Sequence, residues 1–361
     1  MINLKNLKKY FKKKGFLYRD KLASGGFGSV YIVSINNRDY ACKIQYSDQE
    51  SKLVKMKNEC LLSKSLNGKH IVKTNSIHYD TLDENGIKIY SIIMEKALYS
   101  DIKFFMNYLI SGNLIRIINN TINFNWLYYM NNNTLVFFLI QIFDGLKMLY
   151  ESNIVHRDIK PENILVAYGF IVKLCDFGIS CKGNNNFKLG SSTWCNEGPE
   201  YYESKNIEKY EDCFKIDYYP IGLFIYNCLF REHVIDRKYK NILTKDILIH
   251  CLNKANEEMK KHELDENEEI KNFEDGKVIN KENIKFIDKG LSELTRKLIS
   301  PNISDRPNIL EILENNTLNE TRKRIKKISE INQFLEIKLF TELRKPKIKL
   351  KNRKKYNILF F

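Results

Sequence analysis

Metal-binding cysteine pairs are absent from this sequence. It has eight cysteines, but none stands in a CxxC pair or in a Cys/His cluster with zinc spacing. A structural zinc site and a CxxC redox motif are therefore not expected. Scattered cysteines of this kind are typical of reduced thiols, so the sequence predicts a cytoplasmic or nuclear protein.

Membrane-targeting segments are also missing. The start, MINLKNLKKYFKKKGF, has no apolar core of signal-peptide length, and its second residue is Ile2 rather than the glycine that N-myristoylation requires. The two most apolar runs, residues 135–143 and 218–230, are too short to span a bilayer. We expect these runs to be buried helices, and we expect no transmembrane segment.

Positive charge is concentrated at the two ends of the chain. The 361 residues have a formal net charge of +15, of which residues 1–20 contribute +6 and residues 321–361 contribute +11. The part between them has a net charge of −2, so the body is not expected to be a basic nucleic-acid module. Binding of nucleic acid or anionic lipid is predicted only through the basic ends, and solvated charge without a function is the alternative.

The first third of the chain has the pattern of a strand-rich unit. Residues 21–33 and 38–45 alternate like antiparallel strands around the turn Asn36-Asn37, and residues 70–79 and 87–96 resemble two further strands. A helix is expected between the two pairs. A capping box at residues 47–50 predicts its start, and Asn67-Gly68 predicts its end. Its predicted inward side chains are Leu53, Met56, Cys60 and Leu61.

The pattern beyond residue 98 is mainly helical. Residues 134–152 are apolar nearly all round, which predicts a buried helix, and a hairpin is expected within residues 164–178. The predicted domain organisation is a basic N-terminal extension at 1–20, a smaller lobe at 21–97, a larger lobe at 98–314 with inserts near 112–133 and 231–290, and a basic C-terminal tail at 315–361.

A glycine-containing turn and a lysine strand suggest a site for phosphate. In KLASGGFGSVY, Gly25 and Gly28 let the backbone approach an anionic ligand, although a glycine pattern alone is often an ordinary turn. Lys43 follows on an apolar strand, where an unpaired ammonium would be costly, and Glu59 on the expected helix is its predicted partner.

The stretch IVHRDIKPENIL places three polar side chains in one short loop. The carboxylate of Asp158 can accept and orient a hydroxyl, the ammonium of Lys160 can balance phosphate charge, and the amide oxygen of Asn163 can help to hold a hard cation. The expected hairpin folds Asp176 of LCDFG back over Asn163 as a second cation ligand. The loop therefore indicates phosphoryl transfer.

These motifs together resemble the eukaryotic protein kinase family of the serine/threonine type. HRDIKPEN, DFG, the glycine loop and the Ala-x-Lys strand occur in the family's order from Leu22 to Arg306, nearly four fifths of the chain. The resemblance implies an α+β, two-lobed protein-kinase-like fold. The smaller lobe would be β-rich with one main helix, and the larger lobe mainly helical. ATP and Mg²⁺ would bind between them.

The resemblance also implies a role for each site residue. Asp158 would be the catalytic base, Lys160 a γ-phosphate contact, Lys43 the α/β-phosphate contact, and Glu59 the side chain that positions Lys43. Asn163 and Asp176 would be the metal ligands. The implied nucleotide-binding residues are Leu22, Gly25, Gly28, Val30, Ala41, Lys43, Glu95, Ala97 and Leu165. Outside the site, Glu200 would pair with Arg306, and Asp217 would hold the backbone of the catalytic loop.

The sequence thus predicts an ATP-dependent protein serine/threonine kinase that acts on protein substrates. A pseudokinase scaffold tethered through its basic tails is the first alternative, and a small-molecule phosphotransferase of related fold is the second. An activating partner, or docking of the C-terminal tail on the body, is a further expectation.

Two features depart from the family pattern or concern its control. Ser63 and Thr74 occupy positions that are usually apolar in the family and that stack with Phe177 and His156. This departure suggests a basal state that is easily toggled and needs a partner or ligand to order the helix that carries Glu59. A register slip that lets Leu62 or Leu66 fill these positions is the alternative. By the resemblance, Arg157 implies control by a phosphorylated activation segment, and constitutive activity without phosphorylation is the alternative. The candidate phosphorylation sites are Ser180, Ser191 and Ser192.

Overall fold

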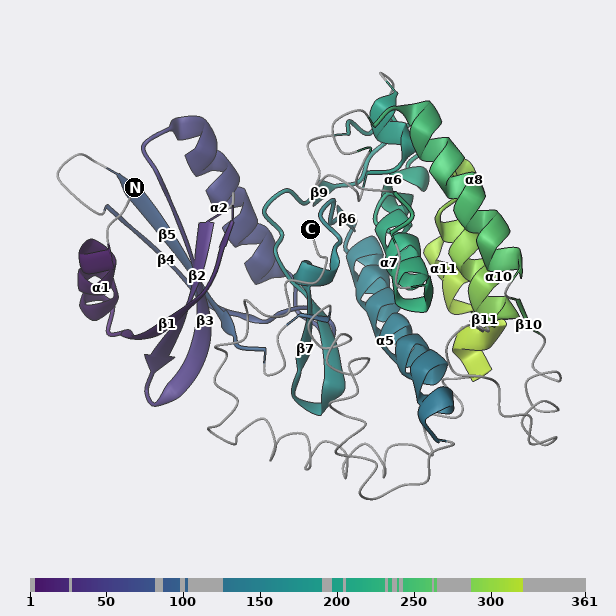
Figure 1. Cartoon of the computed structure of the whole chain (residues 1–361). Helices are drawn as coiled ribbons and strands as arrows, with labels where there is room; N and C mark the ends of the chain where they lie inside the picture. The colour runs from purple at the N-terminus through teal and green to yellow at the C-terminus, as the bar shows by residue number, and fades with distance from the viewer. Residues whose placement is uncertain are drawn as a thin grey trace.

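The computed structural model describes residues 4–25, 28–81, 87–97, 101–102, 126–189, 197–203, 206–230, 233–235, 239, 243–261, 263–264 and 287–320, without the side chains of 126–134, 263–264 and 287–288. Two lobes lie side by side, one built on a β-sheet and the other mainly helical (Figure 1). The expected α+β, two-lobed architecture is therefore confirmed. Most of the predicted inserts and the tail from residue 321 onward lie outside the described residues.

The smaller lobe contains a five-stranded antiparallel sheet in the order β1-β2-β3-β5-β4. The strands are β1 (Leu17–Gly25), β2 (Gly28–Ile35), β3 (Arg38–Ser47), β4 (Thr74–Thr81) and β5 (Lys88–Glu95). Asn36 and Asn37 join β2 to β3 with φ values of 49° and 62°, which a tight two-residue hairpin turn requires. The expected strands are present, and β1 begins four residues before the predicted start of the lobe.

Helix α1 (Leu4–Lys13) covers the face of the sheet that points away from the larger lobe (Figure 1). Its buried side chains Leu7, Tyr10 and Phe11 join an apolar cluster with side chains of β2, β3 and β5. The Tyr10 hydroxyl lies 2.8 Å from Ser91 Oγ. Much of the segment predicted as a basic extension is thus packed against the lobe, with only its lysine face in solvent.

Helix α2 (Glu50–Ser65) packs on the opposite face of the sheet, and its ends differ from the expected ones. The capping-box prediction is wrong: the helix begins at Glu50, and its N-cap Gln49 makes no side-chain cap hydrogen bond. Ser47 belongs to β3, although its Oγ accepts from the Gln49 N–H at 3.0 Å. The helix ends at Ser65, before the predicted Asn67-Gly68 stop. Leu61, predicted to face inward, is 59% exposed, whereas Cys60 is buried as expected.

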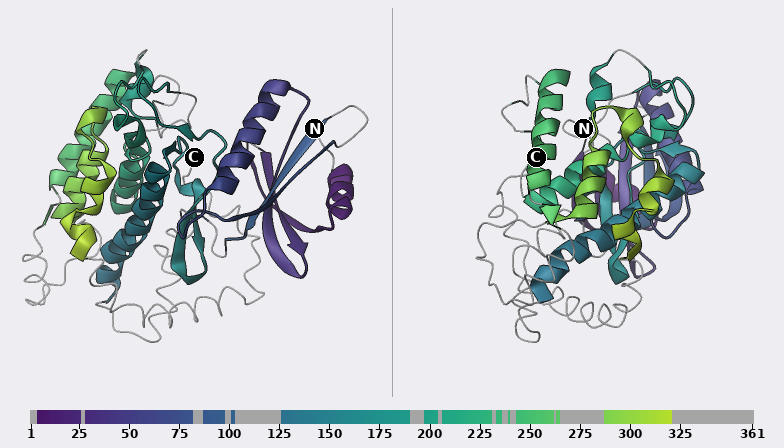
Figure 2. Two further views of the ribbon diagram at one scale, coloured as in Figure 1. Left: turned by 180° about the vertical axis from the view of Figure 1, so that it is seen from behind. Right: turned by 90° about the vertical axis from the view of Figure 1, so that its right-hand side faces the viewer.

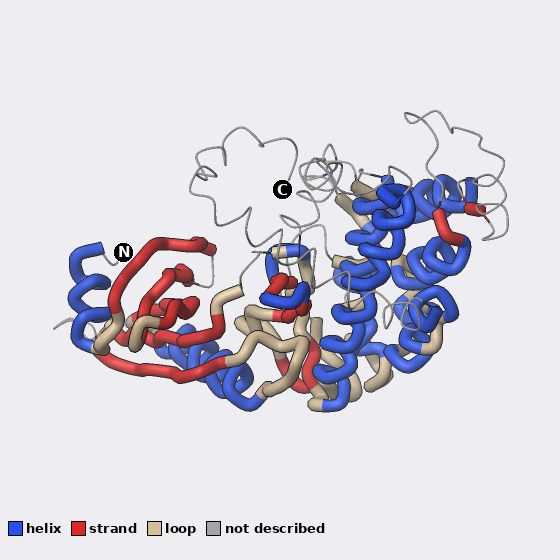
Figure 3. The backbone as a smooth tube through the Cα atoms, turned by 90° about the horizontal axis from the view of Figure 1, so that it is seen from below, coloured by secondary structure: helices blue, strands red, loops and turns tan. Residues whose placement is uncertain are grey.

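Apolar helices form the core of the larger lobe (Figures 2 and 3). The two apolar runs fall in α5 (Trp126–Glu151) and α7 (Tyr219–Phe230), and both are largely buried as predicted. The other helices are α6 (Asp212–Lys215), α8 (Lys245–Lys261), α10 (Lys289–Leu298) and α11 (Ile309–Leu313), with 3-10 turns at Pro161–Asn163, Tyr168–Phe170, Pro199–Tyr202 and Ile303–Asp305. No helix in the described ranges is long and apolar enough to cross a bilayer.

Short strands complete the larger lobe. They pair as β6 (Ile154–Val155) with β9 (Cys181–Lys182), β7 (Ile164–Ala167) with β8 (Ile171–Leu174), and β10 (Glu263–Leu264) with β11 (Ile287–Asp288). The β7–β8 pair is the expected hairpin. Leu318 is fully buried, so part of the segment predicted as a C-terminal tail contributes to the core of this lobe.

A buried ion pair braces the larger lobe. Arg306 donates two hydrogen bonds to the carboxylate of Glu200, at 2.8 and 2.7 Å, and its guanidinium lies 4.7 Å from the centre of the Tyr219 ring. This fork geometry is the arrangement in which arginine binds a carboxylate most firmly. The predicted Glu200–Arg306 pair is therefore present.

Candidate active site

A rigid backbone holds the loop that carries HRDIKPEN. The carboxylate of Asp217 accepts hydrogen bonds from the backbone N–H groups of His156 at 2.6 Å and Arg157 at 2.7 Å, as the resemblance implied. The fully buried His156 ring lies 5.0 Å from the Phe177 ring, and its Nε2 lies 3.0 Å from the Cys175 carbonyl oxygen. The loop is thereby tied both to the start of α7 and to the DFG segment.

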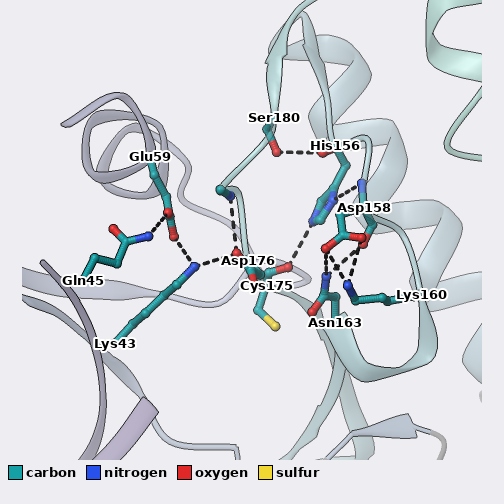
Figure 4. A network of polar contacts seen from close by, with 11 residues as sticks. Lys43, Gln45, Glu59, His156, Asp158, Lys160, Asn163, Cys175, Asp176 and Ser180 are labelled. Carbon is teal, nitrogen blue, oxygen red and sulfur yellow. Dashed lines mark hydrogen bonds and ion pairs between the residues drawn. The ribbon is translucent and has the colours of Figure 1, made fainter. Parts of the chain in front are cut away.

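Of the three polar side chains of this loop, Lys160 and Asn163 both contact Asp158 (Figure 4). Lys160 Nζ donates to both carboxylate oxygens of Asp158, at 2.9 and 2.7 Å. Asn163 Nδ2 donates to the carboxylate and to the backbone oxygen of Asp158, both at 2.9 Å. Since the amide nitrogen of Asn163 is engaged with Asp158, its Oδ1 is the end available to a cation.

The β7–β8 hairpin brings Asp176 beside this loop. Ile164 pairs with Leu174, and the Cys175 N–H donates to the Asn163 carbonyl oxygen at 3.0 Å. Asp176 then turns away from the strand with a φ of 68°, an uncommon value for a residue other than glycine. Residues thirteen positions apart in the sequence therefore become neighbours, as the hairpin prediction required.

Lys43 links the two lobes through two carboxylates. Its Nζ donates to Glu59 Oε1 at 2.5 Å and to Asp176 Oδ1 at 2.7 Å, so strand β3, helix α2 and the DFG segment meet at one ammonium (Figure 4). Burial alone would lower the pKa of Lys43, but the two facing carboxylates outweigh it and raise that pKa above its ordinary value. Lys43 is therefore a fixed cation near neutral pH.

The two carboxylates respond differently to this environment. Burial raises the pKa of Glu59 and outweighs the opposing charge of Lys43. Burial acts in the same direction on Asp176, but the Lys43 ammonium and its hydrogen bond prevail and lower the pKa of Asp176. Asp176 is thus kept ionised, the state in which a carboxylate binds a cation.

The chemistry of the donor set fits a magnesium ion. Asp176 uses Oδ1 for Lys43 and the Gly178 N–H, which leaves Oδ2, and Asn163 offers Oδ1. Two protein oxygens are a usual complement for Mg²⁺, which takes its other ligands from water and phosphate. Within the described ranges, no three His, Cys, Asp or Glu side chains form a separate metal-binding cluster.

The predicted nucleotide-binding residues come from β1, β2, β3, β5 with the residues that follow it, and β7. Gly28 needs to be glycine, because its φ is +124° and a Cβ there would lie 2.4 Å from the Ile44 carbonyl oxygen. Val30, Ala41 and Leu165 are all half-buried, as partly open ligand contacts would be, and Leu22 at 36% is more exposed. Gly25 is paired with Gly28 at the end of the β1–β2 ladder.

The end of β5 carries the last two predicted nucleotide contacts. The Glu95 side chain forms an ion pair with Lys173 at 2.8 Å, and its N–H donates to the Lys73 carbonyl oxygen at 3.0 Å. The N–H of Glu95 is therefore not available to a ligand. Ala97 follows as a half-buried residue at the end of the described segment.

The two polar residues that depart from the family pattern, Ser63 and Thr74, are both at least partly buried. Ser63 is buried, and the buried Thr74 Oγ1 has no hydrogen-bond partner among the described residues. Leu66 is buried in the same apolar cluster as Phe177, and Leu62 packs against that cluster, which supports the alternative that these leucines serve in place of Ser63 and Thr74. Ser180 Oγ donates to the His156 carbonyl oxygen at 3.0 Å, so the hydroxyl of this candidate phosphorylation site is bound to the loop that carries Asp158. Ser191 and Ser192 lie outside the described residues.

Sequence reasoning missed Gln45. Its Nε2 donates to Glu59 Oε2 at 2.6 Å, so it belongs to the same buried network as Lys43 (Figure 4). The available signal was strand alternation, because a residue two positions after Lys43 lies on the same face of β3. A polar side chain on that face needs a polar partner.

Comparison with known proteins places these observations in a family. The family model described as "Protein kinase domain" matches residues 16–318. An Aurora kinase of Saccharomyces cerevisiae is 28% identical over 240 residues, which cover 63% of this chain and 57% of that protein. An Aurora kinase of Candida glabrata is also 28% identical over 240 residues, with 65% and 61% covered. The serine/threonine-protein kinase par-4 of Caenorhabditis briggsae is 23% identical over 320 residues, with 83% and 40% covered. The chain therefore matches less than two thirds of the length of each of these relatives.

Proposed function

The chain belongs to the protein kinase domain family, and on that basis we propose that it is a serine/threonine protein kinase that transfers the γ-phosphate of ATP to protein hydroxyl groups. The names of its relatives, Aurora kinase and serine/threonine-protein kinase, support the substrate class. The observation that carries the proposal is that Asn163 binds Asp158 and Lys43 binds Asp176, on two segments that the β7–β8 hairpin brings side by side. A cytoplasmic or nuclear location is part of the same proposal.

In this proposal, the smaller lobe binds the nucleotide. Lys43 contacts the α- and β-phosphates while Glu59 keeps its ammonium in place. The backbone around Gly28 lies over the phosphates, and Val30, Ala41 and Leu165 hold the adenine between them. Leu22 and Gly25 extend this surface, and the backbone of Glu95 and Ala97 recognises the edge of the base.

The larger lobe supplies the reacting groups. Asn163 and Asp176 would hold Mg²⁺, which would supply positive charge to balance that of the phosphates. Asp158 accepts and orients the substrate hydroxyl as the catalytic base. Lys160, which already contacts both oxygens of Asp158, is close enough to balance the charge on the transferred phosphate.

A pseudokinase scaffold is the second candidate. Its basis is the high charge of the two ends, which suits tethering to a partner, nucleic acid or anionic lipid. The presence of Lys43, Glu59, Asp158, Asn163 and Asp176 favours the enzyme instead. An activating partner and docking of the tail remain compatible with either function.

Transfer of labelled γ-phosphate to a basic protein tests the proposal. We expect transfer by the unaltered chain and a loss of at least about a hundredfold in Asp158→Asn, which removes the base but keeps the shape. Asp246→Asn, at an exposed position in α8, is the matched control and should keep full activity. Transfer that persists in Asp158→Asn, or its absence from the unaltered chain, would overturn the proposal. If a parallel panel of substrates showed transfer to small molecules and none to proteins or peptides, the chain would be a small-molecule phosphotransferase of related fold.

A further inference from the structure

A buried glutamine lies next to the ion pair between β3 and α2. Gln45 is 6% exposed and follows Lys43 by two residues on β3, so both side chains project from the same face of the sheet toward α2. A buried amide is costly unless it forms hydrogen bonds. Gln45 Nε2 forms one at 2.6 Å with Glu59 Oε2.

Each of the two strand residues binds a different oxygen of the Glu59 carboxylate. Lys43 Nζ binds Oε1 at 2.5 Å and Gln45 Nε2 binds Oε2 at 2.6 Å (Figure 4). A carboxylate held at one oxygen can still rotate about its bond to the chain, whereas two donors on one strand fix its direction. The carboxylate in turn fixes the position of the Lys43 ammonium.

Helix α2 has little apolar packing to hold it in this place. Of its sixteen residues, only Glu59, Cys60 and Ser63 are buried, and two of these three are polar. The predicted inward residues Leu53 and Met56 are only half-buried. The polar contacts of Glu59 with β3 therefore contribute to the attachment of α2 to the sheet.

We propose that Gln45 is a positioning residue that holds α2 and Glu59 where they aim Lys43 at the nucleotide phosphates. The site contains the ammonium of Lys43 and the carboxylates of Glu59 and Asp176. Gln45 adds a bond to Glu59 without adding a charge. That Gln45 helps to aim Lys43 at phosphates rests on the proposed kinase function. That Gln45 attaches α2 to β3 does not depend on that function.

The variant Gln45→Met tests the role, because methionine has a similar length and volume but no donor. We expect faster amide hydrogen exchange across α2 with no change in α7. We also expect an ATP KM about tenfold higher, the effect of losing one hydrogen bond to a charged group. Loss of stability alone would lower the active fraction and hence the apparent kcat, but would leave the KM for ATP unchanged. Gln49→Met, at the exposed N-cap of α2, is the control and should match the unaltered chain.

A double-mutant cycle decides whether Gln45 acts through Glu59. In a Glu59→Ala background, Gln45→Met should cause no further loss of Mg-ATP affinity and no further increase in exchange across α2. An equal loss in both backgrounds would overturn the inference, and so would a Gln45→Met variant that behaves like the unaltered chain. The exchange and binding measurements need no phosphate transfer. Failure of the kinase proposal would therefore be distinguishable from failure of this inference.

Discussion

Buried charges in this protein are stabilised by partners that lie far away in the sequence. Lys43 has its two carboxylates 16 and 133 residues away, and Asp217 accepts from backbone groups about 60 residues before it. A buried charge is tolerated only when such partners are supplied, and here the partners come together only when the whole chain is folded. This makes Asp217 a sensitive point for a pH experiment.

The pH dependence of Asp217 follows from its burial. Burial raises the pKa of Asp217 to about 7 from an ordinary value of 3.8, against the N–H bonds from His156 and Arg157. Because the folded state binds this proton more tightly, the stability gained is fully present below about pH 4 and is lost as the pH rises through about 7. The difference in free energy of unfolding between the unaltered chain and Asp217→Asn should therefore be about 2 kcal/mol larger at pH 5 than at pH 8.

Urea unfolding of both proteins at the two pH values measures this difference. Other titrating groups are common to the two proteins, so their effects cancel in the comparison. An equal difference at both pH values, or a larger one at pH 8, would contradict the assignment of a raised pKa to Asp217.

At the scale of elements, helix α1 packs on the smaller lobe, although its residues lie in the segment predicted to be a basic extension. The sequence shows seven basic residues in the first 20, whereas the structure buries Leu7, Tyr10 and Phe11 between them. Ion pairs of Lys13 and Lys14 with Asp80, at 3.0 and 3.1 Å, fasten the end of the helix to β4. The helix therefore forms part of the smaller lobe, and its exposed lysines face outward.

Substitution of Phe11 tests the docking of α1. Phe11 is fully buried, so Phe11→Ala should lower the free energy of unfolding by about 3 kcal/mol or more. Lys9→Ala, on the exposed face of the same helix, should change it by no more than about 0.5 kcal/mol. Denaturant unfolding compares the two variants, and equal effects would mean that α1 does not dock on the sheet in solution.

The elements differ in how well the sequence predicts them. The β7–β8 hairpin and the meeting of Asn163 with Asp176 follow from local alternation and a short connection, which act within a few residues. The docking of α1 depends on surfaces distant in the sequence, so a local pattern could not reveal it. Strand alternation could place Gln45 on the same face of β3 as Lys43, but it could not show that Gln45 contacts Glu59. The start of α2 was misplaced because β3 extends through Ser47 and removes that residue from the cap.

At the scale of the whole molecule, the site is a meeting of two lobes. Lys43 and Glu59 belong to the smaller lobe, Asp158 and Asn163 to the larger lobe, and Asp176 bonds across the junction between them. The buried Glu200–Arg306 pair and the Asp217 contacts keep the larger lobe's half of the site in place. The proposed chemistry therefore requires both lobes to present their charges to one nucleotide.

Calorimetric binding of ATP with and without Mg²⁺ tests this central claim most directly. The unaltered chain should bind ATP more tightly in the presence of Mg²⁺, and Asp176→Asn should lose at least about tenfold of that gain, because the ion loses its only charged protein ligand. An ATP affinity that is the same with and without Mg²⁺ in the unaltered chain, or an Asp176→Asn variant that keeps the full magnesium effect, would contradict the account.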